Sequence, residues 1–112
     1  MSKVSKDAVK ALLHAQPFVG MQTEVVLDEA SKTTTLIKFG SQIARYNSKK
    51  HILVVCTPDG ITSHSTVDIL NTLLDLAKLP FSFDKKDDKW FLHNTETDRL
   101  SEWKGERRFT LK

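Results

Sequence analysis

The last fourteen residues carry the side chains best suited to binding a charged partner. Cations alternate there with aromatic rings, in the set Arg99, Trp103, Lys104, Arg107, Arg108 and Phe109. Single-stranded nucleic acid requires this combination, because phosphates pair with cations and bases stack on rings. A protein interface uses the same residue types, since tryptophan and arginine are frequent energetic anchors. A third interpretation is structural: the rings pack this tail onto the domain and the arginines point into water.

The hydroxyl-rich segment 62–66 is a second candidate site. Its residues Ser63, His64, Ser65 and Thr66 precede an apolar helical pattern, so their hydroxyls are suited to capping the first turn of a helix. The free N–H groups of a helix start can also hold a phosphate or a carboxylate. No glycine-rich phosphate loop precedes the segment, and capping is therefore the favoured interpretation.

Cys56 is the single cysteine of the chain, and it raises the question of catalysis or metal binding. A nucleophilic thiol needs a nearby base, and a metal site with Asp59 and His64 would need further ligands at short spacing. A position at the end of the apolar run 52–56 favours a buried structural cysteine instead. The sequence therefore predicts no catalytic residue, no metal site and no cofactor, and we expect a protein that is not an enzyme.

Hydrophobic spacing predicts the elements that hold these residues. Apolar residues three and four positions apart predict a short helix over 4–15 and a main helix over 64–79, with Ser65 and Asp68 as its capping pair. Strands are expected at 22–28, 33–39, 42–46 and 52–56, in a closing hairpin around 81–83 and 90–92, and at 107–111. The tight turns favour an antiparallel meander, in which 52–56 is expected to be a central strand covered on both faces.

The expected fold is therefore α+β, with an antiparallel sheet of about five or six strands, the main helix on one face and the N-terminal helix beside it. The core is expected to consist of Leu12, Val25, Ile37, Ile43, Leu53, Val55, Ile69, Leu73, Leu74, Phe81, Phe83 and Trp90. On strand 33–39 we expect Thr35, Ile37 and Phe39 to share one side.

Length and charge limit the organisation of the chain. Its 112 residues fit one domain, which we place at 1–98, followed by a basic aromatic tail at 99–112 that could be a terminal strand of the same domain. The tail holds five basic and two acidic residues and so accounts for the whole net charge of +3. That excess is small beside the basic faces of dedicated nucleic-acid binders.

The same features predict the compartment. There is a single cysteine, no apolar run of signal-peptide length and no apolar segment long enough to cross a bilayer. We therefore expect a cytoplasmic protein that does not associate with membranes.

Several short motifs over residues 33–92 resemble a group of small, uncharacterised proteins of tailed bacteriophages. They are the glycine-turn hairpin at 39–45 with its Ile43-Ala44 pair, the Ser65-Thr66 helix start, the helix core at 70–74 and the strand Lys89-Trp90-Phe91-Leu92. The tryptophan that usually precedes the helix in that group is missing, and Pro58-Asp59-Gly60 stands there instead. The resemblance implies a phage protein of the host-cell cytoplasm with a compact α+β fold, and it implies no activity and no functional residue.

Three functional hypotheses follow. The first is a small non-enzymatic phage-type accessory protein that binds and modulates or inhibits a host or viral protein. The second is a single-stranded nucleic-acid-binding protein that acts through its basic aromatic tail. The third is a small nucleotide- or anion-binding protein that uses the helix start at 62–66. An exposed edge strand could also pair with a second copy, so a homodimer is compatible with the pattern.

Overall fold

The computed structural model describes residues 3–20, 22–58, 60–61 and 63–111. Its helices are α1 (Lys3–Leu13) and α2 (His64–Leu76). Its strands are β1 (Phe18–Gly20), β2 (Thr23–Asp28), β3 (Thr33–Lys38), β4 (Ser41–Asn47), β5 (Ile52–Cys56), β6 (Phe81–Lys86), β7 (Lys89–Asn94), β8 (Arg99–Glu102) and β9 (Glu106–Thr110). None of the helices in the described part of the chain is long and apolar enough to cross a membrane.

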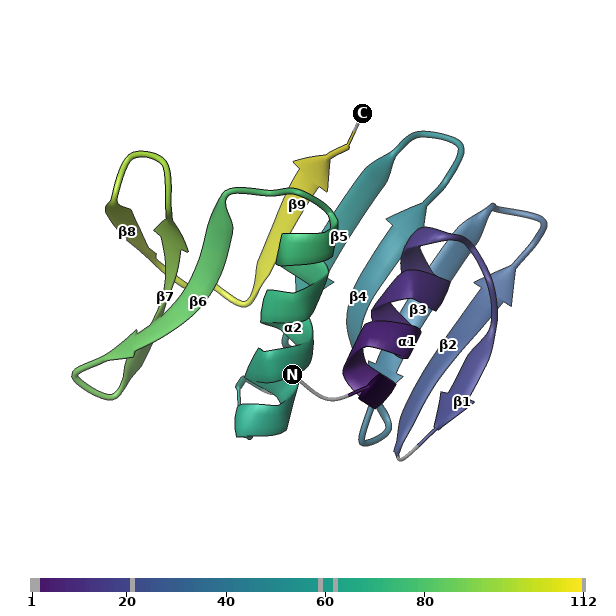
Figure 1. Cartoon of the computed structure of the whole chain (residues 1–112), viewed down its shortest axis with the longest axis horizontal. Helices are drawn as coiled ribbons and strands as arrows, with labels where there is room; N and C mark the ends of the chain where they lie inside the picture. The colour runs from purple at the N-terminus through teal and green to yellow at the C-terminus, as the bar shows by residue number, and fades with distance from the viewer. Residues whose placement is uncertain (1–2, 21, 59, 62, 112) are drawn as a thin grey trace.

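The strands form two antiparallel sheets. The large sheet has six strands in the order β1-β2-β3-β4-β5-β9, and the small sheet has three in the order β6-β7-β8. Helices α1 and α2 lie side by side on one face of the large sheet, and the small sheet stands beyond α2 (Figure 1). The predicted α+β class and the meander are confirmed. The closing hairpin, which was expected in the main sheet, belongs to a separate sheet completed by β8.

The helices form where the apolar spacing predicts them. On α1, Ala8, Val9 and Leu12 are buried at the spacing of one helix face. The start of α2 differs from the expected pair: Ser63 is the N-cap, and its Oγ accepts a hydrogen bond from the backbone N–H of Thr66 at 3.3 Å. The helix ends at Leu76, three residues before the predicted end.

On β3 the buried side is opposite to the expected one. Thr34 and Leu36 are fully buried beneath the helices, whereas Thr35 and Ile37 lie on the other face of the sheet. The prediction that Ile37 belongs to the core is therefore wrong, and Phe39 is exposed. Because β-branched residues occupy several successive positions here, the sequence shows no clear alternation that distinguishes the two faces.

Strand β5 lies inside the sheet, between β4 and β9, but only one of its faces is covered. Leu53 and Val55 are fully buried on the helix side, whereas Ile52 and Val54 are half-buried on the opposite face. The expectation of cover on both faces is wrong because α1 and α2 both pack on the same side (Figure 1). Antiparallel sheets commonly leave one face uncovered in this way.

One hydrophobic core joins the helices to both sheets. The predicted core residues that are buried are Leu12, Val25, Ile43, Leu53, Val55, Ile69, Leu73, Leu74 and Phe83. Phe81 and Trp90 are partly buried and pack against that core. Phe109 of β9 is a further buried member, so the C-terminal strand contributes to the same core as α2.

Candidate functional site

Trp103 ties the small sheet to the end of β5. Its indole ring packs edge-on against Phe83 with the ring centroids 4.8 Å apart and the planes at 78°. The indole N–H donates to Thr57 Oγ1 at 2.7 Å, and the backbone N–H of Trp103 donates to the carbonyl of Trp90 at 2.9 Å. This tryptophan is therefore fixed by one ring contact and two hydrogen bonds.

Phe109 has no surface role in this arrangement, because its side chain is only 7% exposed. Its ring lies 5.4 Å from that of Phe81, measured between centroids. The guanidinium carbon of Arg107 lies 4.6 Å from the centre of the Phe81 ring and 5.3 Å from that of Phe109. Arginine and two rings thus form a stack that fastens β9 to β6 through cation–π attraction and apolar contact.

The remaining cations of the predicted site are exposed. Arg99 lies on β8, Arg108 lies opposite Val54 on the uncovered face of the large sheet, and Lys104 follows β8. Lys104 Nζ lies 3.6 Å from a carboxylate oxygen of Glu102, and both side chains are largely solvated. Such a surface pair contributes little to stability, so these cations can exchange their partners at low cost.

A groove lies where β9 meets the small sheet. Its volume is about 300 Å³, and it is lined by Leu92, Glu102, Trp103, Lys104, Glu106 and Arg107. Three of the six residues predicted to bind a partner, Trp103, Lys104 and Arg107, therefore meet in one hollow. Arg99 and Arg108 do not line it, and Phe109 lies in the core.

A larger hollow of about 630 Å³ lies around β1, β2 and β3, between Val19 and Phe39. Both of these side chains are exposed. Glu24 is the one acidic side chain in its lining, and no basic side chain lines it among the described residues. It offers apolar contact but few directional groups, and the groove beside β9 is for that reason the stronger candidate.

At the second predicted site, the start of α2, the hydroxyl groups cap the helix and contact one another. Ser63 Oγ lies 3.1 Å from Ser65 Oγ and 3.0 Å from Thr66 Oγ1, in addition to its bond from the Thr66 N–H. His64 is exposed. Thr62 lies outside the described residues. The hydroxyls here satisfy one another, as the capping interpretation expects.

Cys56 is a buried residue of β5. Its Sγ lies 3.6 Å from the carbonyl oxygen of Gln42, and no hydrogen bond joins it to a histidine among the described residues. Burial raises the pKa of the thiol; the charge of Arg45 opposes this rise and that of Glu106 adds to it. A raised pKa leaves less thiolate at neutral pH and so opposes a nucleophilic role.

The metal site considered for Cys56 has no support from the described residues. Asp59, one of its three residues, lies outside them. Across the part of the chain that the structure describes, no three histidine, cysteine, aspartate or glutamate side chains are arranged to hold a metal ion.

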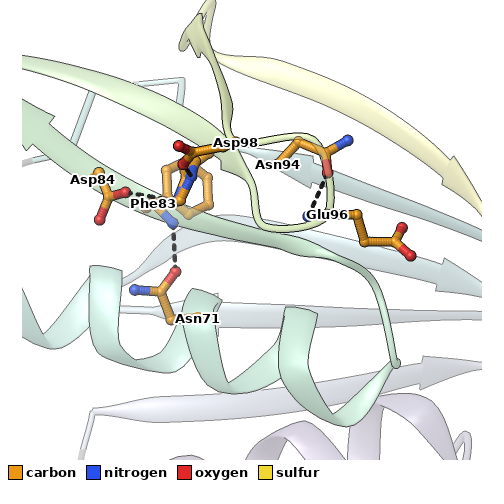
Figure 2. Close-up of polar contacts among 7 residues, drawn as sticks. Asn71, Phe83, Asp84, Asn94, Glu96 and Asp98 are labelled. Atoms are coloured by element: carbon orange, nitrogen blue, oxygen red, sulfur yellow. Dashed lines mark hydrogen bonds and ion pairs between the residues drawn. The ribbon is translucent and has the colours of Figure 1, made fainter.

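The small sheet carries polar contacts that the sequence does not predict, here called the brace. His93 of β7 lies between two carboxylates, with Nδ1 3.2 Å from Asp84 and Nε2 2.7 Å from Asp98. On the helix side, Asn71 Oδ1 accepts a hydrogen bond from the backbone N–H of Phe83 at 2.7 Å (Figure 2). No local pattern predicts these contacts, because they depend on how β6 pairs with β7 and on where α2 packs.

The turn between β7 and β8 is ordered by its own side chain. Asn94 Oδ1 accepts a hydrogen bond from the backbone N–H of Glu96 at 2.9 Å (Figure 2). It accepts a second one from the backbone N–H of Thr97 at 3.2 Å. These hydrogen bonds shape the segment 94–98, which directs the chain into β8. The brace and this turn hold the small sheet, and with it one wall of the groove, in place.

Comparison with known proteins identifies one family. The sequence model of the Kyanoviridae Gp96 protein matches residues 1–110. The resemblance to phage proteins is confirmed by this match, which extends well beyond the 33–92 over which the motifs were recognised. No curated protein and no solved structure matches the chain significantly.

Proposed function

Because the chain belongs to the Kyanoviridae Gp96 family of phage proteins, we propose that it is a small accessory protein that binds a host or viral protein. Binding takes place at the groove between β9 and the small sheet, in the cytoplasm of the host cell. The protein acts by occupying and modulating its partner, without catalysis. The observation that carries the proposal is the convergence of Trp103, Lys104 and Arg107 on one hollow.

The groove has the mixed character of a protein-binding surface. Trp103 and Leu92 supply an apolar floor, and charges of both signs stand at the rim. Interfaces between proteins combine an apolar centre with a polar rim, and aromatic and arginine side chains are frequent energetic anchors in them. Trp103 is already fixed by Phe83 and Thr57, so little side-chain entropy is lost when a partner binds to it.

The same observations disfavour nucleic acid. Phe109 is buried and the Trp103 ring is packed against Phe83, so neither ring is free to stack fully on a base. Glu102 and Glu106 stand beside the cations of the groove and would repel phosphates. The helix start at 63–66 gains no support as an anion site, because its hydroxyls are engaged with one another.

The proposal predicts that cations of the groove control capture of the partner. A tagged protein is incubated with lysate of infected host cells, and the variant Lys104→Ala/Arg107→Ala is compared with wild type. The matched control is Lys49→Ala/Lys50→Ala, in the exposed β4–β5 turn outside the groove. The groove variant should recover at least about tenfold less of a specific host or viral protein, as expected for the loss of interface anchors.

The control should recover as much as wild type, and all variants are first checked for an unchanged circular dichroism spectrum. Equal recovery by the groove variant and the control would contradict the proposal, as would the absence of any specific protein. Binding to a labelled oligothymidylate at low salt, weakened by the groove variant and by added salt, would favour the nucleic-acid hypothesis instead.

A further inference from the structure

The outer edge of β9 is an unused strand edge. At the two ends of the pairing with β5, backbone hydrogen bonds show which residues face that strand. The N–H of Thr57 donates to the carbonyl of Gly105, and the N–H of Leu111 donates to the carbonyl of His51. Hydrogen-bonded pairs alternate along an antiparallel ladder, so Arg107 and Phe109 direct their backbone groups toward β5. Glu106, Arg108 and Thr110 therefore direct theirs outward. Within the described residues no strand pairs with this edge.

The other sheet edges are shorter than β9 or are bonded to another element. At the opposite end of the large sheet, β1 has only three residues and follows Pro17, which are two common ways of blunting an edge. On the outer edge of β6, the backbone N–H of Phe83 donates a hydrogen bond to the side chain of Asn71 on α2. On β8, which has four residues, Leu100 and Glu102 direct their backbone groups outward. The charge at this edge is the carboxylate of Glu102, which is paired with Lys89 and Lys104.

A groove borders the start of this edge of β9. The groove of about 300 Å³ runs between the start of β9, at Glu106 and Arg107, and the small sheet. Its walls are held by the Trp103 contacts and by the bond from Phe83 to Asn71. An added strand lies about 4.8 Å from its neighbour, and its backbone would meet the outward groups of Glu106, Arg108 and Thr110 directly.

The charges on β9 indicate which kind of strand can pair with its outer edge. β9 carries Arg107 and Arg108 against Glu106, and Arg108 has no ion pair among the described residues. Residues directly opposite one another on neighbouring strands contact each other, and opposite charges stabilise such pairs. The register that pairs all five residues of β9 with a second copy sets Arg108 against its own counterpart, so charge disfavours full-length self-pairing. A strand with a carboxylate opposite Arg108 has no such repulsion.

We propose that β9 binds an extended, acidic segment of the partner protein as an additional strand of the large sheet. The inference rests on the proposed function and specifies how the partner is held. Backbone hydrogen bonds to Glu106, Arg108 and Thr110 provide the affinity, and pairing of a carboxylate with Arg108 provides the preference for acidic segments. The groove receives the side chains on the inner face of the added strand.

The test uses a displayed library of random dodecapeptides, with the full-length protein as bait. Selected peptides should be acidic, alternate in polarity and lack proline. Their affinity is then measured for wild type, Arg108→Ala and Arg108→Pro. Proline removes the outward N–H of residue 108 and crowds the edge, but it leaves the bonds to β5 intact, so it should weaken binding at least about tenfold more than alanine does. Unchanged circular dichroism and thermal midpoint verify folding.

Three results would overturn the inference. The first is that no peptide is enriched over an unrelated bait. The second is that the selected peptides bind Arg108→Pro as well as they bind Arg108→Ala. The third is that the wild-type protein forms a dimer in sedimentation that Arg108→Pro dissociates, which would assign the edge to a second copy. The proposed function is tested separately. If the Lys104→Ala/Arg107→Ala variant loses its partner while Arg108→Pro retains it, the groove binds the partner without strand addition.

Discussion

Replacing Trp103 with alanine is expected to lower the free energy of unfolding by about 3 kcal/mol, near the lower end for removal of a packed aromatic side chain. The change removes the contact with Phe83 and the donor to Thr57, whose side chain is 4% exposed. It also separates the small sheet from the end of β5. Urea denaturation followed by far-ultraviolet circular dichroism measures the effect without relying on tryptophan fluorescence.

A double-mutant cycle separates the hydrogen bond from the ring contact. Trp103→Phe keeps a ring against Phe83 but leaves the Thr57 hydroxyl without its donor, and Thr57→Val removes the acceptor. We expect a coupling energy of about 1 kcal/mol between the two positions, the usual net value of one hydrogen bond. If Trp103→Ala were as stable as wild type, the tryptophan would not join the sheets and the groove would lack a fixed wall.

Replacing Phe109 with alanine is expected to lower the free energy of unfolding by about 3–4 kcal/mol, because it empties a buried site between β9 and β6. The ring is a member of the core, and it supports the stack with Phe81 and Arg107. Loss of the ring should release β9 from the large sheet. The measurement is again urea denaturation, together with the thermal midpoint.

Thr110→Ala is the matched control, since Thr110 lies next to Phe109 on the same strand and is exposed. This control should change the free energy of unfolding by no more than about 0.5 kcal/mol, as is usual for surface positions. Equal effects of the two substitutions would show that Phe109 is not held in the core, and the tail would then have to be regarded as a loose appendage.

Most elements of the fold are predictable because their apolar spacing is clear. Leu70, Leu73 and Leu74 repeat at helical spacing, and α2 follows. β8 was not predicted, since all four of its residues are exposed and Leu100 is its single apolar residue. The buried side of β3 was misassigned, because three successive threonines supply no alternation. The β6–β7 hairpin forms its own sheet because β8 pairs with β7, and no local sequence pattern predicts that pairing.

The residue types of the candidate site can be predicted, but their roles cannot. Basic and aromatic residues at 99–112 make the tail a candidate binding segment, and the sequence offers no means of telling packed rings from exposed ones. Trp103 meets Thr57 across 46 positions of sequence, and Phe109 meets Phe81 across the gap between two sheets. Such contacts arise only from tertiary packing, so the local sequence does not predict them.

β9 is an ordered strand whose one ring, that of Phe109, is buried and whose outer edge pairs with no strand among the described residues. Residue-resolved amide hydrogen exchange of the free protein tests this claim most directly, because the two sets of amides alternate along one strand. The N–H groups of Arg107 and Phe109, directed toward β5, should be strongly protected, whereas that of Arg108 should exchange far faster. Uniformly fast exchange over 106–110, or an Arg108 amide as protected as its neighbours in the dilute free protein, would contradict the account.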